Sequence, residues 1–96
     1  MSSGKAKVLA TTRDDSPLVQ RAYSAHFRQH AHEGTLPAPT PADDSCLAEL
    51  DGRRYVVLRG ADGRVLRVYR VRHVHTSGVD QLYQLKRWPQ ELEKAR

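Results

Sequence analysis

The stretch from Arg53 to His75 constrains the fold more than any other part of the chain. It reads RRYVVLRGADGRVLRVYRVRHVH, in which arginines are interspersed with valines, leucines and tyrosines on both sides of a Gly-Ala-Asp-Gly corner. Runs of β-branched and aromatic residues are typical of strands, and a short glycine-containing segment between two such runs is typical of a hairpin turn. The stretch holds seven arginines and a single acidic residue, Asp62. We therefore predict a basic β-hairpin.

Neighbouring segments extend this hairpin to a three- or four-stranded antiparallel meander. Asp51-Gly52 is a strong two-residue turn signal, because both residue types tolerate a positive φ. The longest expected strand does not alternate cleanly between apolar and polar residues. Its pattern predicts either a β-bulge near Tyr69-Arg70 or partial burial of both faces. The expected strands cover residues 46–50, 55–59, 64–75 and 81–87.

A long amphipathic helix is expected before the sheet, in residues 16–34. Ser16 can cap the exposed N–H groups, and Pro17 tolerates the first helical position because its missing N–H is not needed there. Gly34 can adopt the left-handed conformation that ends a helix. An apolar stripe follows helical spacing, so we expect the helix to cover one face of the sheet. The stripe includes Leu18, Val19, Tyr23 and Phe27.

The remaining segments complete a single α+β domain. Residues 1–15 are small, polar and aperiodic, which is typical of a flexible arm. Residues 35–45 carry prolines at alternate positions, and each favours extended backbone, so we predict a Pro-rich linker there. Trp88-Pro89 opens a short C-terminal helix, and we expect Trp88 to be substantially buried beside it. The sheet and this helix together occupy residues 46–96.

Charge and composition favour a soluble binding protein. The net charge is +5, but residues 1–52 sum to −2 and residues 53–96 to +7, so the basic character belongs to the sheet. Such asymmetry suggests a polyanionic partner. The chain shows neither a transmembrane segment nor a signal-peptide pattern, and its one cysteine cannot form an intrachain disulfide. We therefore expect a cytoplasmic protein that does not bind membranes.

The basic sheet predicts contact with DNA or RNA. Arginine and lysine side chains that neutralise phosphates release counterions, and outward-facing Tyr69 and Tyr83 would stack on bases. The predicted bulge near Tyr69-Arg70 would let Arg67 and Arg70 point the same way. Two alternatives stay open: a solvated face that prevents edge aggregation, and a protein-interaction module, such as an inhibitor or adaptor, that binds an acidic protein surface. The predicted nucleic-acid-binding residues are Arg54, Arg59, Arg64, Arg67, Arg70, Arg72, Lys86 and Arg87.

Metal and catalytic chemistry receive little support. Two histidine pairs, His26 with His30 and His73 with His75, have spacings at which imidazoles can bind zinc, but no Cys or carboxylate completes a known pattern. Cys46 follows an acidic segment that would raise its pKa, whereas a reactive thiolate needs basic neighbours. Sequence motifs of hydrolases, P-loop proteins and zinc proteases do not occur. We expect no cofactor, no metal and no enzyme activity.

The second half of the chain resembles small uncharacterised proteins carried on proteobacterial plasmids and integrative elements. The similar segments are YVVLR at 55–59, VYRVR at 68–72 and LKRWP at 85–89, with a glycine-containing turn after the first. The resemblance covers about half of the chain and excludes the first 45 residues. It implies a bacterial, mobile-element setting and no particular chemistry. For so small a core we also expect that a homodimer could form by exchange of the helix.

Overall fold

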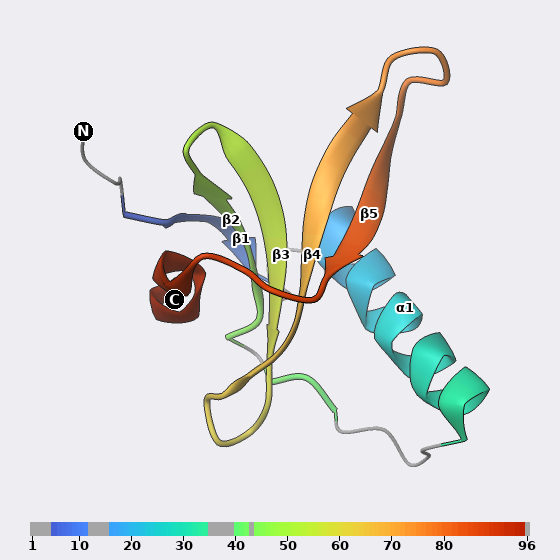
Figure 1. Ribbon diagram of the computed structural model, residues 1–96, viewed down its shortest axis with the longest axis vertical. Coiled ribbons are helices and arrows are strands. Elements are labelled where there is room, and N and C mark those ends of the chain that lie inside the picture. Colours follow the sequence, from blue (N-terminus) through green and yellow to red (C-terminus); the bar gives the residue numbers. More distant parts are fainter. Residues whose placement is uncertain (1–4, 12–15, 35–39, 43, 96) are drawn as a thin grey trace.

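A five-stranded antiparallel sheet organises the computed structural model, which describes residues 5–11, 16–34, 40–42 and 44–95. The strands are ordered β1-β2-β3-β4-β5, and Figure 1 shows a long helix and a short 3₁₀-helix on opposite sides of the sheet. None of the described helices is long and apolar enough to cross a membrane. The elements are β1 (Lys7–Thr11), α1 (Pro17–Glu33), β2 (Cys46–Leu50), β3 (Arg53–Arg59), β4 (Val65–Val74), β5 (Val79–Leu85) and the 3₁₀-helix η2 (Gln90–Lys94).

The predicted α+β class and antiparallel meander are confirmed, but the sheet has five strands instead of three or four. The additional strand is β1, whose residues were expected in a flexible arm. It pairs with β2 from Lys7↔Glu49 to Thr11↔Cys46, and a register shift between Val8 and Ala10 interrupts the pairing. Residues 1–4 and 12–15 of the predicted arm, and residues 35–39 and 43 of the predicted linker, lie outside the described residues.

Helix α1 begins and ends where its capping residues predict. The Ser16 hydroxyl accepts a hydrogen bond from the Val19 N–H at 3.5 Å, and Gly34 has the left-handed φ of 72°. The predicted stripe is confirmed at Leu18, Val19 and Tyr23, which pack on the sheet, and the buried face continues through Ala22 and His26 instead of Phe27. Phe27 is 36% exposed and therefore is not a core residue.

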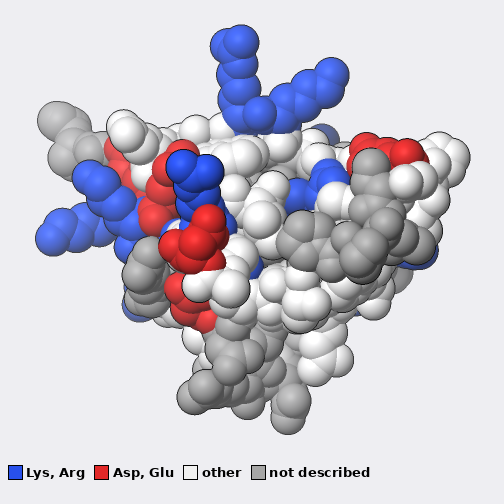
Figure 2. Space-filling model, turned by 90° about the horizontal axis from the view of Figure 1, so that it is seen from below, with Lys and Arg blue, Asp and Glu red and all other residues white. Residues whose placement is uncertain are grey.

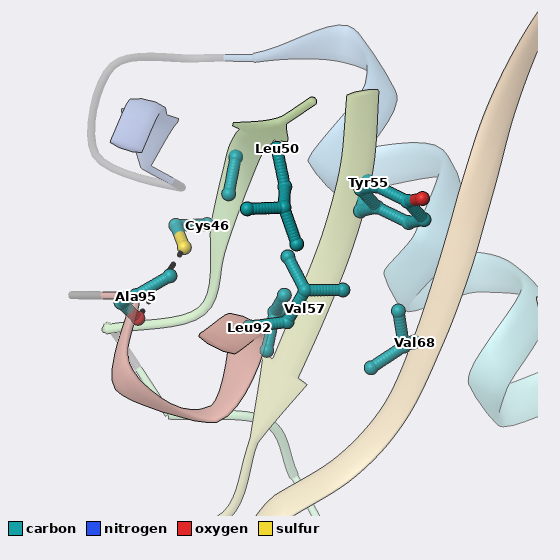
Figure 3. Packing of buried hydrophobic residues seen from close by; sticks show 8 residues of the cluster. Cys46, Leu50, Tyr55, Val57, Val68, Leu92 and Ala95 are labelled. Carbon is teal, nitrogen blue, oxygen red and sulfur yellow. Dashed lines mark hydrogen bonds between the residues drawn. The ribbon is translucent and has the colours of Figure 1, made fainter. Parts of the chain in front are cut away.

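The core has two layers, one on each face of the sheet. Between α1 and the sheet, Val19 and Ala22 pack with buried residues of β2, β3 and β4. On the opposite face, Leu92 of η2 and Ala95 cover a second cluster (Figure 3). The β2 to β4 members of the first cluster are Leu47, Val56, Leu58, Tyr69 and Val71, and those of the second are Cys46, Ala48, Leu50, Tyr55, Val57 and Val68.

Strand β4 shows why its pattern does not alternate cleanly. Both of its faces are partly covered, which is one of the two predicted explanations. A register shift also occurs, but earlier than Tyr69-Arg70: Leu58 pairs with Arg67 and Arg59 with Val65, so Leu66 is the extra residue. From Val68 to Val74 the pairing with β5 is regular.

The turn of the β2–β3 hairpin has the predicted geometry, whereas the C-terminal segment differs from its prediction. Asp51 and Gly52 have φ values of 53° and 76°, as the two-residue turn requires. The expected C-terminal helix is a short 3₁₀-helix. Trp88 is only partly buried: its indole N–H donates to the Glu93 carboxylate at 3.2 Å, near the surface.

Candidate nucleic-acid interface

The predicted basic residues are divided between the two faces of the sheet. Arg67 and Tyr69 share the α1 side of β4 with Val71, because residues of one parity face the same way. Val68 belongs to the opposite face, and Arg70 therefore lies there too. The prediction that Arg67 and Arg70 point the same way is wrong, because the bulge precedes both residues and leaves their alternation intact.

Arg59 is a structural residue. Only 1% of its surface is exposed, and its guanidinium donates hydrogen bonds to four carbonyl oxygens, three of them at the C-terminal end of the chain. A buried arginine whose terminal nitrogens donate to carbonyl groups cannot reach a phosphate without breaking these bonds. The acceptors are Gly63, Leu92, Glu93 and Ala95, at 3.0, 3.3, 2.6 and 2.8 Å.

Arg67 is held beneath α1. Its Nε donates to Nδ1 of His26 at 3.1 Å, and its Nη2 lies 3.4 Å from Nε2 of His30 and 3.7 Å from the Glu33 carboxylate. Its side chain is 12% exposed. The helical histidine pair therefore contacts an arginine on the neighbouring strand, and Arg67 is not available as a surface phosphate ligand.

Arg54 and the second histidine pair surround Asp80. The Asp80 carboxylate lies 3.0 Å from Nδ1 of His73 and 3.2 Å from Nη2 of Arg54. The hydrogen bond with His73 is the main cause that lowers the pKa of Asp80; burial opposes it, and the interactions with Arg54 lower the pKa further. The His75 ring centroid lies 5.0 Å from that of His73. Among the described residues, no group of three or more His, Cys, Asp or Glu is placed to hold a metal ion.

The face of β3, β4 and β5 opposite α1 carries an exposed basic and aromatic surface, which we call the Arg70 face. In register, Arg70 lies between Tyr55 of β3 and Tyr83 of β5, and Arg72 lies beside Gln81. The Arg72 guanidinium carbon is 5.9 Å from the centre of the Tyr83 ring, a cation–π contact, and the Tyr83 hydroxyl donates to Gln81 at 2.6 Å. The Arg70 face consists of Arg53, Arg70, Arg72, Gln81 and Tyr83.

Exposure and charge distinguish this surface. Arg53, Arg72 and Tyr83 are exposed, and Arg70 is partly exposed. None of the residues that define the Arg70 face is acidic. The Arg70 Nε is buried and has no hydrogen-bond partner among the described residues, so part of its donor capacity is unused. The surface lies toward the tip of the β4–β5 hairpin, on the side away from α1 (Figure 1).

The other predicted contacts lie outside the Arg70 face. Lys86 and Arg87 are exposed in the segment that follows β5. Arg64 is exposed in the turn before β4, where its backbone N–H donates to the Asp62 carboxylate at 3.0 Å. Figure 2, which views the molecule from below, shows the basic side chains in separate groups, one of them interleaved with acidic side chains. On that side the predicted basic surface is not continuous.

Tyr69 and Cys46 are both buried. Tyr69 is 4% exposed beneath α1, so it cannot stack on a base as was predicted. Cys46 is a fully buried member of the second core cluster. Its thiol points to the Ala95 carbonyl oxygen at 3.8 Å (Figure 3). Burial is the main cause that raises the pKa of this thiol; the Arg59 charge opposes the increase and Asp44 adds to it. The increase has the predicted direction, but burial contributes more than the acidic segment.

Sequence reasoning missed the contribution of Gln81 and gave Arg53 little weight. The period of 2 along a strand was the available signal, since it places Gln81 and Tyr83 on one face.

A comparison with models of protein families, with curated proteins and with solved structures finds no match to this chain.

Proposed function

We propose that the protein binds nucleic acid through the Arg70 face. The observation that carries this proposal is the division of the arginines. Arg59, Arg67 and Arg54 are engaged within the protein, whereas Arg72 and Arg53 are exposed on a face without acidic residues. Tyr83 gives this face an exposed ring beside Arg72.

The chemistry of the face suits a phosphate backbone. A guanidinium presents several donors in a planar fork that matches phosphate oxygens. Exposed aromatic rings stack on bases of any identity. We therefore expect binding that depends strongly on salt and weakly on sequence. Lys86 and Arg87 extend the positive charge beyond the end of β5.

The experiment is a fluorescence-anisotropy titration of labelled single-stranded and duplex oligonucleotides at several salt concentrations. The test variant carries Arg70→Gln and Arg72→Gln, which remove two charges from the Arg70 face. Each lost phosphate contact lowers the salt slope by about 0.9 for duplex DNA and about 0.7 for a single strand. We expect weaker binding, and a salt slope that is reduced by the amount that corresponds to one or two lost phosphate contacts.

The control variant carries Lys5→Gln and Lys7→Gln, which remove the same charge from exposed positions. Lys5 precedes β1, and Lys7 pairs with Glu49 on the α1 side of the sheet. This variant should keep the wild-type slope. Equal slopes for the test variant and the wild type would show that binding occurs elsewhere. No binding of either oligonucleotide at low salt would refute the proposal.

A protein-interaction module remains the alternative, because a basic face without acids also suits an acidic protein surface. A pull-down from the native host with and without nuclease treatment separates the two functions. Partners that stay bound after nuclease treatment, and that generic duplex DNA does not displace, would favour the protein partner. The resemblance of the sheet segments to mobile-element proteins supports an accessory role in such an element under either function.

A further inference from the structure

Helix α1 and the sheet leave a hollow of about 300 Å³ on the side opposite the Arg70 face. Helix α1 contributes one wall, and β4 and β5 contribute the other. None of the residues that line the hollow is acidic. The polar side chains that line it are those of Arg21, Ser24, Arg28 and Tyr69, and Gln81, whose side chain belongs to the Arg70 face, borders it on β5.

The two arginines lie on one side of α1, because Arg21, Ser24 and Arg28 are spaced by three and four residues. Arg21 is fixed at the mouth by a hydrogen bond from its Nη1 to the Asp80 carbonyl oxygen at 2.7 Å. The Asp80 carboxylate itself is directed to Arg54 and His73. The hydrogen bond to the Asp80 carbonyl oxygen joins Arg21 to a neutral group, so it does not neutralise the positive charge of Arg21.

Tyr69 supplies an independent indication of a ligand. Its side chain is 4% exposed, yet its buried hydroxyl has no hydrogen-bond partner among the described residues. A buried hydroxyl without a partner is costly, and such groups are rare in native proteins. Burial raises the pKa of Tyr69, whereas the positive charges of Arg67 and Arg28 oppose this increase. Arg28 therefore acts electrostatically on the same hydroxyl that lacks a partner.

We propose that this hollow binds a small molecule through a phosphate or carboxylate group, which the Arg21 and Arg28 side chains hold and to which Tyr69 donates its hydroxyl hydrogen. The volume is at the lower limit for ligand pockets, so it suits a small metabolite. Guanidinium groups and a hydroxyl are the donors that recognise oxyanions. This site lies on the other side of the sheet from the nucleic-acid interface, with Gln81 at the border of both, and the proposal does not depend on that interface.

The test is a two-dimensional NMR titration of the ¹⁵N-labelled full chain with inorganic phosphate and, separately, with succinate. Sodium chloride at matched ionic strength is the control. We expect saturable shifts at the amides of Ser24, Tyr69 and Gln81 with one or both anions and not with chloride. Saturation by phosphate alone would assign a phosphate group to the ligand, and saturation by succinate alone a carboxylate.

Two variants identify the residues that bind. Arg28→Gln and Tyr69→Phe should each weaken binding by about tenfold, since each removes a hydrogen bond to a charged group. Tyr69→Phe should keep the fold, because the hydroxyl has no partner in the described structure. The variant with Arg70→Gln and Arg72→Gln should bind the anion normally. Shifts that chloride reproduces, that do not saturate, or that survive both variants would overturn the proposal.

Discussion

At the residue scale, Arg59 and Arg70 come from one run of arginines but have different environments. Arg59 donates to carbonyl oxygens at the C-terminal end of the chain, and Arg70 lies on the exposed side of β4. We expect Arg59→Ala to lower the free energy of unfolding by about 3 kcal/mol or more, because several buried acceptors lose their donor. Urea denaturation measures this change.

Arg59→Lys is the informative companion variant. Lysine keeps the charge, but its ammonium cannot reproduce the planar fork that reaches several carbonyl groups at once. It should therefore be nearly as unstable as Arg59→Ala. A lysine variant with wild-type stability would show that charge alone accounts for the role of Arg59.

Asp80 predicts a pH dependence of stability. Its pKa is lowered in the folded protein, mainly by His73 and then by Arg54. Its contribution is therefore complete above the pKa of an unfolded aspartate, about 4, and is lost as the pH falls through the lower folded value. The difference in Tm between the wild type and Asp80→Asn should shrink below about pH 4. Thermal unfolding from about pH 6 to pH 2 tests this; a difference that stays constant over that range would contradict it.

The sequence identifies arginines but not their partners. Arg59 becomes buried because the C-terminal segment returns to it across 33 to 36 positions of the chain. Arg67 becomes buried because α1 brings His26 to it across 41 positions. Local patterns carry no information about such distant contacts. Only Arg59 of the predicted site residues is fully buried, and Arg54 and Arg67 are partly exposed but engaged by other side chains. The other five are exposed or partly exposed: Arg64, Arg70, Arg72, Lys86 and Arg87.

At the scale of elements, α1 illustrates correct boundaries with a face that was predicted only in part. Caps depend on neighbouring residues and can be read from sequence, whereas the buried face depends on what the helix packs against. Val19 is fully buried and Phe27 is exposed. Val19→Ala should lower the free energy of unfolding by about 2 kcal/mol, whereas Phe27→Ala should lower it by less than about 1 kcal/mol. The apolar stripe in the sequence had indicated a core position for Phe27.

Chemical denaturation of the two variants measures these costs. Both substitutions place alanine in the same helix, so helix propensity differs little between them. A larger loss for Phe27→Ala than for Val19→Ala would contradict the packing of α1 on the sheet.

The same contrast holds for the strands: features that depend on adjacent residues could be predicted, and features that depend on distant segments could not. The Asp51-Gly52 turn and the bounds of β2 were predictable, because turn geometry depends on adjacent residues. Strand β1 was not predictable, because its pairing with β2 joins segments on either side of α1. Its apolar residues are divided between both core layers: Val8 packs against one cluster and Ala10 against the other. No single-face pattern therefore appears in the sequence.

At the scale of the whole molecule, the sheet separates the two proposed binding sites. Its α1 side holds the part-buried Arg67 contacts and the proposed oxyanion site, and its other side holds the Arg70 face toward the β4–β5 tip. Helix α1 packs on the sheet of its own chain, and exchange of this helix between two chains remains a prediction. The central claim is that the side of the sheet away from α1 meets nucleic acid.

The most direct test of this claim maps the contact on the protein. A single-stranded oligonucleotide is added to the ¹⁵N-labelled protein at low salt, and amide shifts are followed residue by residue. We predict the largest shifts at Arg53, Arg70, Arg72 and Tyr83, with Val19 and Ala22 of α1 unchanged, and reversal of the shifts when salt is raised. Shifts confined to α1, or none at low salt, would contradict the account.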